Sequence, residues 1–219
     1  MGRLGFFDYI TANLPYILQG LKTTLGVFFS VLALAFAMAI VFAILKVFGP
    51  KWVKALLKFY VWVFRGTPIV LQLFIVYYGF PNLGLVLDKW VVVITVFCLS
   101  AAAYETEIIR GGIISIDKGQ FEACRALGLT FGQTLRRVVV PQAIRRVLPP
   151  TCSEVIILFK DTSLLAGVAI FDMMRRARDL VITDMRIEPF VVVLVLYLLF
   201  SSIMVLVFSR LEKRFAVNP

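Results

Sequence analysis

The sequence predicts an all-α integral membrane protein whose residues 1–219 form a single transmembrane domain, and two observations carry this prediction. Of the 219 residues, 61% are hydrophobic and only 16% are charged, whereas soluble proteins have roughly a half and a quarter. The apolar residues also fall into long uncharged runs, and about 20 such residues in a helix span the hydrocarbon of a bilayer. A water-soluble core cannot bury this much apolar surface.

Five transmembrane helices are expected, and three of them are uninterrupted. The first covers residues 17–47 and is uncharged between Lys22 and Lys46. The third covers residues 89–112, and the fifth covers residues 189–210. Each run is long enough to cross the bilayer as one helix.

The second and fourth expected spans, residues 55–80 and 149–171, are interrupted. The second contains the sequence Arg-Gly-Thr-Pro at residues 65–68, where the proline removes a backbone donor and the glycine loosens the helix. The fourth carries charges among apolar residues, namely Glu154, Lys160 and Asp161. Both interruptions are therefore candidate functional features as well as structural ones.

The distribution of basic residues predicts the orientation. Five crossings place the two ends on opposite sides, and cytoplasmic segments carry an excess of Lys and Arg. With the N-terminus outside and the C-terminus cytoplasmic, more than half of the 23 basic residues lie inside. The basic residues behind the net charge of +10 then set the topology and contact anionic lipid headgroups. Nucleic acid is therefore not expected as a partner.

The sequence excludes several kinds of chemistry. It contains no histidine, which removes mechanisms based on an imidazole base. Its three cysteines have no paired spacing that would indicate a zinc site. No phosphate-binding loop is present. We therefore expect no catalytic residue, no metal and no cofactor bound by this chain, and an energy source on a partner.

The segment of residues 115–146 is too long for a tight connection and is expected to be cytoplasmic. Its first part reads as a short helix with small residues at Ala123 and Ala126, ended by Gly128 in the left-handed conformation. Thr130 and Gln133 have the spacing of a capping box, so a new helix begins there and is expected to end at Pro141. Composition favours an interfacial linker; the alternative is a docking helix for another protein, anchored by Phe121 and Leu127.

This segment resembles the EAA loop of bacterial ABC-importer permeases. That loop has the pattern Glu-Ala-Ala, three residues, Gly, nine residues, Ile-x-Leu-Pro, and this sequence departs from it at Cys124, Val138 and Val140. The resemblance implies that the residues coupling to an ATPase are Phe121, Glu122, Ala123, Cys124, Arg125, Ala126, Leu127 and Gly128.

Three further stretches resemble the polar and basic amino-acid branch of that family, the histidine/arginine/glutamine-type permeases: residues 65–68 with Gln72, residues 104–116 and residues 160–164. The resemblance implies a type I importer-permease fold in the bacterial cytoplasmic (inner) membrane. It also implies a second permease subunit, identical or different, two cytoplasmic ABC ATPases that carry ATP and Mg²⁺, and an extracytoplasmic solute-binding protein.

The charges of the fourth span are the main candidates for a substrate site. Glu154 and Asp161 are seven residues apart and share a helix face. One interpretation pairs Asp161 with Lys160 or with Arg65. The other is a site for a polar, basic amino acid such as arginine, histidine or lysine. The cationic groups of the substrate would contact Glu154 and Asp161, and Lys160 would contact the carboxylate of the substrate. The hydroxyls of Thr162 and Ser163 would add polar contacts.

The broken second span and the end of the third supply further candidates. Thr67 and Gln72 are expected on the pathway, although the break is equally consistent with a simple kink. Tyr104 and Glu107 are secondary candidates, and Glu107 has the spacing to pair with Arg110.

The competing function is an ATPase-independent secondary carrier or channel for cationic solutes. Five spans do not divide into two equal halves, and the sequence shows no internal repeat, which disfavours the common inverted-repeat carriers.

Overall fold

The computed structural model describes residues 5–215, and all regular elements within these residues are helical, as predicted. The elements in chain order are α1 (Phe6–Phe48), α2 (Lys51–Gly66), α3 (Ile69–Phe74), η1 (Ile75–Gly79), η2 (Phe80–Leu83), α4 (Lys89–Ile114), α5 (Lys118–Ala126), α6 (Phe131–Thr134), η3 (Leu135–Val139), α7 (Val140–Asp161), η4 (Thr162–Val168), α8 (Met173–Asp184) and α9 (Glu188–Phe215).

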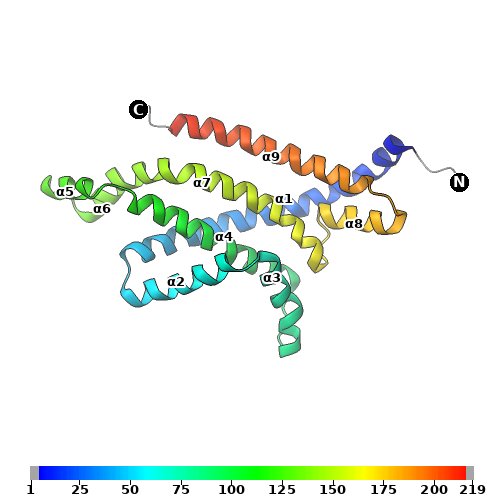
Figure 1. Ribbon diagram of the computed structural model, residues 1–219, viewed down its shortest axis with the longest axis horizontal. Helices are drawn as coiled ribbons and strands as arrows, with labels where there is room; N and C mark the ends of the chain where they lie inside the picture. Colours follow the sequence, from blue (N-terminus) through cyan, green and yellow to red (C-terminus); the bar gives the residue numbers. More distant parts are fainter. Residues whose placement is uncertain (1–4, 216–219) are drawn as a thin grey trace.

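The long helices form an elongated bundle (Figure 1). Helix α1 packs most extensively on α4, α4 packs on α7, and α7 packs on α9. Helices α5 and α6 lie at one end of the long axis, and α8 lies at the other end against the first half of α1 (Figure 1). Helix α2 lies beside α1 and α4, while α3 turns away from the bundle (Figure 1).

The close contact between α1 and α4 follows from small side chains. Ala35, Ala39 and Ala43 recur every fourth residue of α1, so they lie on one face, and each is at most 1% exposed. Ala102 of α4 is likewise fully buried. Small residues let membrane helices approach closely and gain van der Waals contact.

Three helices, α1, α4 and α9, are long and apolar enough to cross a membrane. Each contains one of the uninterrupted spans expected from the sequence, residues 17–47, 89–112 and 189–210. Helix α1 begins at Phe6, well before residue 17, and its 43 residues measure about 64 Å at 1.5 Å per residue. It therefore extends beyond the roughly 30 Å of hydrocarbon.

The two interrupted spans differ in structure. Helix α2 and the segment Ile69–Leu83 are long and apolar enough to cross a membrane only when they are taken together as one span. The two are bent by 100° relative to each other at the break. Residues 149–171 correspond to the second half of α7 together with η4. Within the described chain α7 is not among the helices apolar enough to span alone, so the fourth crossing stays a prediction.

The expectation that a helix ends at Pro141 was wrong. Helices α6, η3 and α7 follow one another without a break from Phe131 to Asp161. The η3 segment is a π-helical turn, and Val140 N donates to Leu135 O, five residues earlier. Because a proline ring clashes with the carbonyl four residues before it, this wider turn gives the ring room and the helix continues.

Candidate functional site

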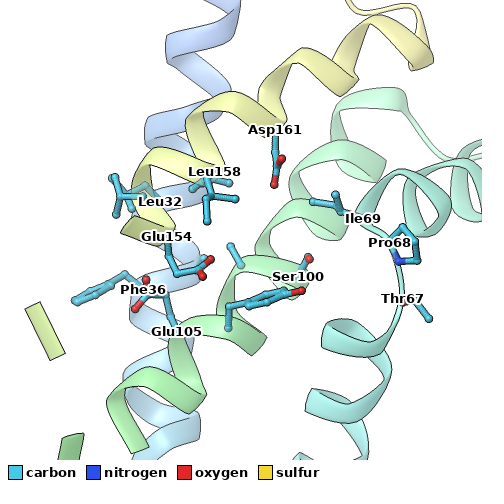
Figure 2. Close-up of a pocket in the computed structure, with 15 residues that line it drawn as sticks. Leu32, Phe36, Thr67, Pro68, Ile69, Ser100, Glu105, Glu154, Leu158 and Asp161 are labelled. Carbon is cyan, nitrogen blue, oxygen red and sulfur yellow. The ribbon is translucent and has the colours of Figure 1, made fainter. Parts of the chain in front are cut away.

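A cavity of about 250 Å³ lies where α1, α4 and α7 meet the break between α2 and α3 (Figure 2). One side is apolar, formed by Leu32 and Phe36 of α1 and Leu158 of α7. The remaining walls carry polar groups of α4, α7 and the break. The lining residues are Leu32, Ala35, Phe36, Thr67, Pro68, Ile69, Ser100, Ala101, Tyr104, Glu105, Glu154, Val155, Ile157, Leu158 and Asp161.

Three carboxylates line this cavity: Glu105 of α4, and Glu154 and Asp161 of α7. Figure 2 shows their side chains directed into the space between the helices. None of the three forms an ion pair with any residue that the structure describes. Carboxylates that share a cavity repel one another when charged, and a bound cation relieves that repulsion.

Glu105 is the most enclosed of the three, since only 6% of its surface is exposed. Its Oε2 accepts a hydrogen bond of 2.9 Å from Thr151 Oγ1. Its Oε1 is buried and has no hydrogen-bond partner. A buried acceptor left unpaired is unfavourable by about 1–3 kcal/mol, so this oxygen is available to a donor that enters the cavity.

Sequence reasoning did not select Glu105 as a site residue, nor Ser100, which also lines the cavity. The signal was present for Glu105, because it is the first charge after a long uncharged stretch of α4. For Ser100 the signal is its spacing one turn before Tyr104, which places both on one face of α4.

A guanidinium lies beside the cavity. The Arg65 Cζ atom is 5.1 Å from the centre of the Tyr104 ring, a cation–π contact, and that ring lines the cavity. Among the described residues, Asp161 forms no ion pair with either Arg65 or Lys160. The protein-only pairing considered from the sequence is therefore not what the structure shows.

Gln72 repairs the break in the second span instead of lining the cavity. In an unbroken helix the Phe64 carbonyl would accept from the amide of residue 68, but that residue is a proline. Gln72 Nε2 supplies the missing donor, at 3.0 Å from Phe64 O, 3.1 Å from Thr67 O and 2.9 Å from Thr67 Oγ1. The bend is thus held by a side chain two turns further along.

The structure brings four of the predicted substrate-site residues together at the cavity: Glu154, Asp161, Thr67 and Tyr104. It does not bring Lys160, Thr162, Ser163, Gln72 or Glu107 there.

Thr162 is fully buried instead. Its Oγ1 donates 2.6 Å to Phe159 O and lies 3.3 Å from the Tyr197 hydroxyl of α9. Lys160 is exposed, and α7 ends at Asp161. The change of helix type there directs the Thr162 hydroxyl toward Phe159 O and α9.

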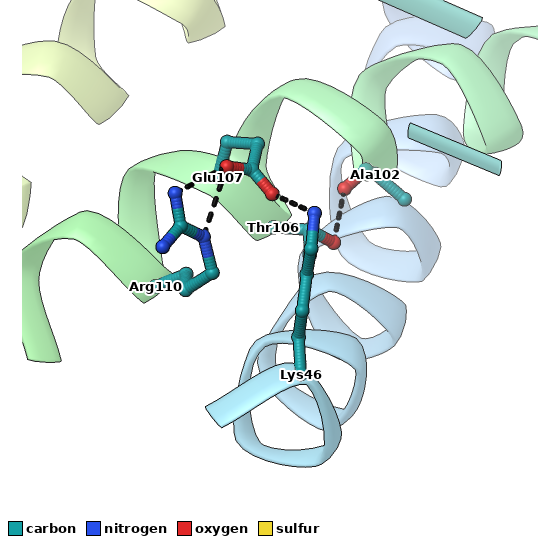
Figure 3. Close-up of polar contacts among 5 residues, drawn as sticks. All are labelled: Lys46, Ala102, Thr106, Glu107 and Arg110. Atoms are coloured by element: carbon teal, nitrogen blue, oxygen red, sulfur yellow. Dashed lines mark hydrogen bonds and ion pairs between the residues drawn. The ribbon is translucent and has the colours of Figure 1, made fainter. Parts of the chain in front are cut away.

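Glu107 belongs to a separate cluster of charges (Figure 3). Its Oε2 accepts from Arg110 Nε at 2.9 Å and from Arg110 Nη2 at 2.7 Å, as the spacing predicted. Its Oε1 accepts from Lys46 of α1. The carboxylate is thus neutralised by two cations and ties the last turns of α1 to α4.

The predicted coupling segment has the local structure expected from its sequence. Helix α5 ends with Leu129 N donating to Cys124 O and Gly128 N donating to Arg125 O, which together form a Schellman motif. Gly128 has φ +71°, which glycine adopts without strain. Thr130 and Gln133 form the capping box that begins α6.

The exposed surface of α5 differs from the predicted docking set at two residues. Cys124 is buried within this chain and Phe121 is half-buried, so Cys124 is closed to a docking partner and Phe121 is only partly open to one. Leu127 is 78% exposed. The other exposed members of the set are Glu122, Ala123, Arg125, Ala126 and Gly128. A partner that docks here meets one large apolar side chain surrounded by small and charged ones.

Comparison with protein families gives a match over residues 35–217 to a family described as binding-protein-dependent transport system inner membrane component. Among curated proteins, the arginine transport system permease protein ArtQ of Bacillus subtilis (strain 168) is 35% identical, covering 97% of this chain and 98% of that protein. The glutamine transport system permease protein GlnP of Escherichia coli (strain K12) is 33% identical, covering 96% and 99%.

Solved structures give the same result. The crystal structure of an amino acid ABC transporter with histidines contains a chain that matches with a TM-score of 0.88 and 28% identity, covering 97% of this chain and 100% of that one. An inward-facing structure of the MetNI methionine ABC transporter matches with a TM-score of 0.70 and 16% identity, covering 99% and 100%, which shows a common fold.

Proposed function

The chain belongs to the family of binding-protein-dependent transport system inner membrane components, and on that premise we propose that it forms the translocation pathway for a basic amino acid. As an amino-acid permease of the ABC type it is not an enzyme, and a partner ATPase hydrolyses the ATP. The relatives include permeases for arginine, glutamine and L-cystine, so the family leaves the substrate open.

The observation that carries the substrate proposal is the set of three carboxylates around one cavity, Glu105, Glu154 and Asp161, none of which has an ion-pair partner among the described residues. Arginine, lysine or histidine brings an α-ammonium and a cationic side chain, and a carboxylate accepts a guanidinium in bidentate geometry. The neutral side chain of glutamine would leave more of this negative charge uncompensated.

The substrate's own carboxylate needs a cation, and Arg65 is the best placed. Arg65 and Lys160 are both exposed and neither lines the cavity itself, but the Arg65 guanidinium stacks on Tyr104, whose ring does line it. The aliphatic part of the substrate would lie against Leu32 and Phe36. Arg65 therefore replaces Lys160 in the role expected from the sequence.

The proposed assembly contains this subunit, a second permease subunit that is identical or different, two cytoplasmic ABC ATPases and an extracytoplasmic solute-binding protein. Exposed Leu127 on α5 supports docking of the ATPase at that end. The last turns of α9 point toward the end that carries α5, and the first turns of α1 lie at the opposite end (Figure 1). This arrangement supports an inner-membrane protein with its N-terminus outside and its C-terminus cytoplasmic. No observation favours an ATPase-independent carrier or channel.

The test is uptake by liposomes that contain the permease with its ATPase and binding protein. The variants Glu105→Gln, Glu154→Gln and Asp161→Asn should each raise the KM for arginine or lysine about 10-fold to 100-fold, because a hydrogen bond to a charged group is worth about 1.5–3 kcal/mol. The effect on any glutamine uptake should be smaller. Glu212→Gln on α9, outside the cavity, is the control. Equal effects on basic and neutral substrates would refute the assignment.

A further inference from the structure

A second groove, of about 340 Å³ and open to the surface, lies between α1 and α4. It shares no residue with the acidic cavity. The two helices are in contact next to it, where Cys98 Sγ of α4 lies 3.9 Å from Val31 O of α1. The groove is lined by Lys22, Thr23, Gly26, Val27, Ser30, Trp90 and Ile94.

The groove has Lys22 and Trp90 at one end, apolar residues in its middle and Ser30 at the other end. Lys22 comes directly before the long uncharged run of α1, and Trp90 lies in the first turn of α4. From Lys22 to Ser30 the groove follows about 12 Å of helix at 1.5 Å per residue. Val27 and Ile94 line it beyond the lysine, and a Cβ atom added at Gly26 would meet no atom within 4 Å. The groove therefore has room for a chain-like apolar ligand.

The ammonium of Lys22 and the indole N–H of Trp90 in this groove have no ion-pair or hydrogen-bond partner among the described residues. The lining contains no carboxylate. The nearest carboxylate along α4 is Asp88, which accepts a hydrogen bond of 2.8 Å from the backbone N of Trp90 as the cap of that helix and is not a lining residue. A lysine and an indole donor that no described residue binds complement an anion with several acceptor oxygens.

We propose that this groove binds an anionic phospholipid of the surrounding bilayer. The phosphate would meet Lys22 and the Trp90 N–H, and one acyl chain would lie over Gly26 between Val27 and Ile94. A lysine at the boundary of an apolar helix places its charge at the headgroups while its stem stays in the apolar region. Tryptophan is enriched at the same depth, and anionic headgroups attract basic side chains there.

Binding is tested on the full-length permease in mild detergent, by native mass spectrometry and by thermal unfolding with added phosphatidylglycerol or phosphatidylcholine. Phosphatidylglycerol should bind more tightly and raise the unfolding midpoint more. Lys22→Gln should weaken its binding about fivefold, the contribution of one lysine at an anionic surface. Gly26→Leu should abolish the midpoint shift, because its side chain fills the groove.

Two matched variants serve as controls. Lys118→Gln removes a lysine from the first turn of α5, and Gly111→Leu adds the same side chain to α4 at another position with open space. Both should keep wild-type phosphatidylglycerol binding. Equal binding of the two lipids, or unchanged affinity in Lys22→Gln, would overturn the proposal. It would also be overturned if Gly26→Leu separated two permease copies without changing lipid binding, since the groove would then be a contact between copies.

Discussion

Replacing Gly20 by alanine should destabilise the protein, although alanine is the better helix former. The added methyl would lie 2.5 Å from the Asp172 carbonyl carbon, 2.5 Å from Met173 N and 2.6 Å from Asp172 O. These are backbone atoms at the start of α8, so no side-chain rotation relieves the overlap. Thr24, one turn further along α1, accepts a hydrogen bond of 3.3 Å from Met173 N, and separation of the helices would stretch it.

The expected net loss is about 1–3 kcal/mol. Overpacking costs about 1–3 kcal/mol, and a weakened hydrogen bond adds about 1 kcal/mol. Against this stands a gain of about 1 kcal/mol in helix propensity from replacing glycine. For a chain of this size 1 kcal/mol corresponds to roughly 2–4 °C in the midpoint of thermal unfolding, so the midpoint should fall by several degrees.

Thermal unfolding of the purified permease measures the effect, with Gly111→Ala as the matched control. Gly111 also lies inside a long helix, but an added methyl there would meet no atom within 4 Å. The control gains the same helix propensity without the overlap and should be unchanged or slightly stabilised. If Gly20→Ala were as stable as Gly111→Ala, the close packing of α8 on α1 would be refuted.

Three further predictions follow from individual contacts. Gln72→Leu leaves the Phe64 carbonyl without its donor and should lower the unfolding free energy by about 1–3 kcal/mol; an unchanged thermal midpoint would contradict the role of Gln72 at the break. Gly128→Val should abolish substrate-stimulated ATP hydrolysis in the complex, whereas Gly84→Val, equally strained at φ +78° but far from α5, should retain it. Burial raises the pKa of Asp172 from 3.8 to about 6. The raised pKa means that its contribution to stability is complete below about pH 4 and is lost as the pH rises through about 6, by about 3 kcal/mol in total. Asp172→Asn should flatten this part of the pH profile of thermal unfolding, and an unaltered profile would assign it to another group.

Features encoded by neighbouring residues could be predicted from the sequence. The left-handed Gly128, the capping box of Thr130 and Gln133, and the pair Glu107–Arg110 all appear as expected. Each depends on residues within one turn of each other, where helical geometry alone fixes the distance. The shared face of Glu154 and Asp161 was predictable for the same reason, and both line the cavity.

Features that depend on how helices pack could not be predicted in this way. Spacing placed Thr162 and Ser163 next to Asp161, but the change to η4 and the packing of α9 turn Thr162 toward Tyr197. Glu105 was passed over because its role depends on α7, which supplies Thr151 and the other carboxylates.

The sequence by itself determined that the chain is helical, lies in a membrane, is broken before Ile69 at Pro68 and has a short helix that ends at a left-handed Gly128. These properties follow from hydropathy and from local backbone chemistry. Only the tertiary structure decided that Glu105 joins Glu154 and Asp161 while Glu107 is neutralised by Lys46 and Arg110. The physical reason is that a side chain's partner across a bundle depends on the rotation of each helix, which packing sets.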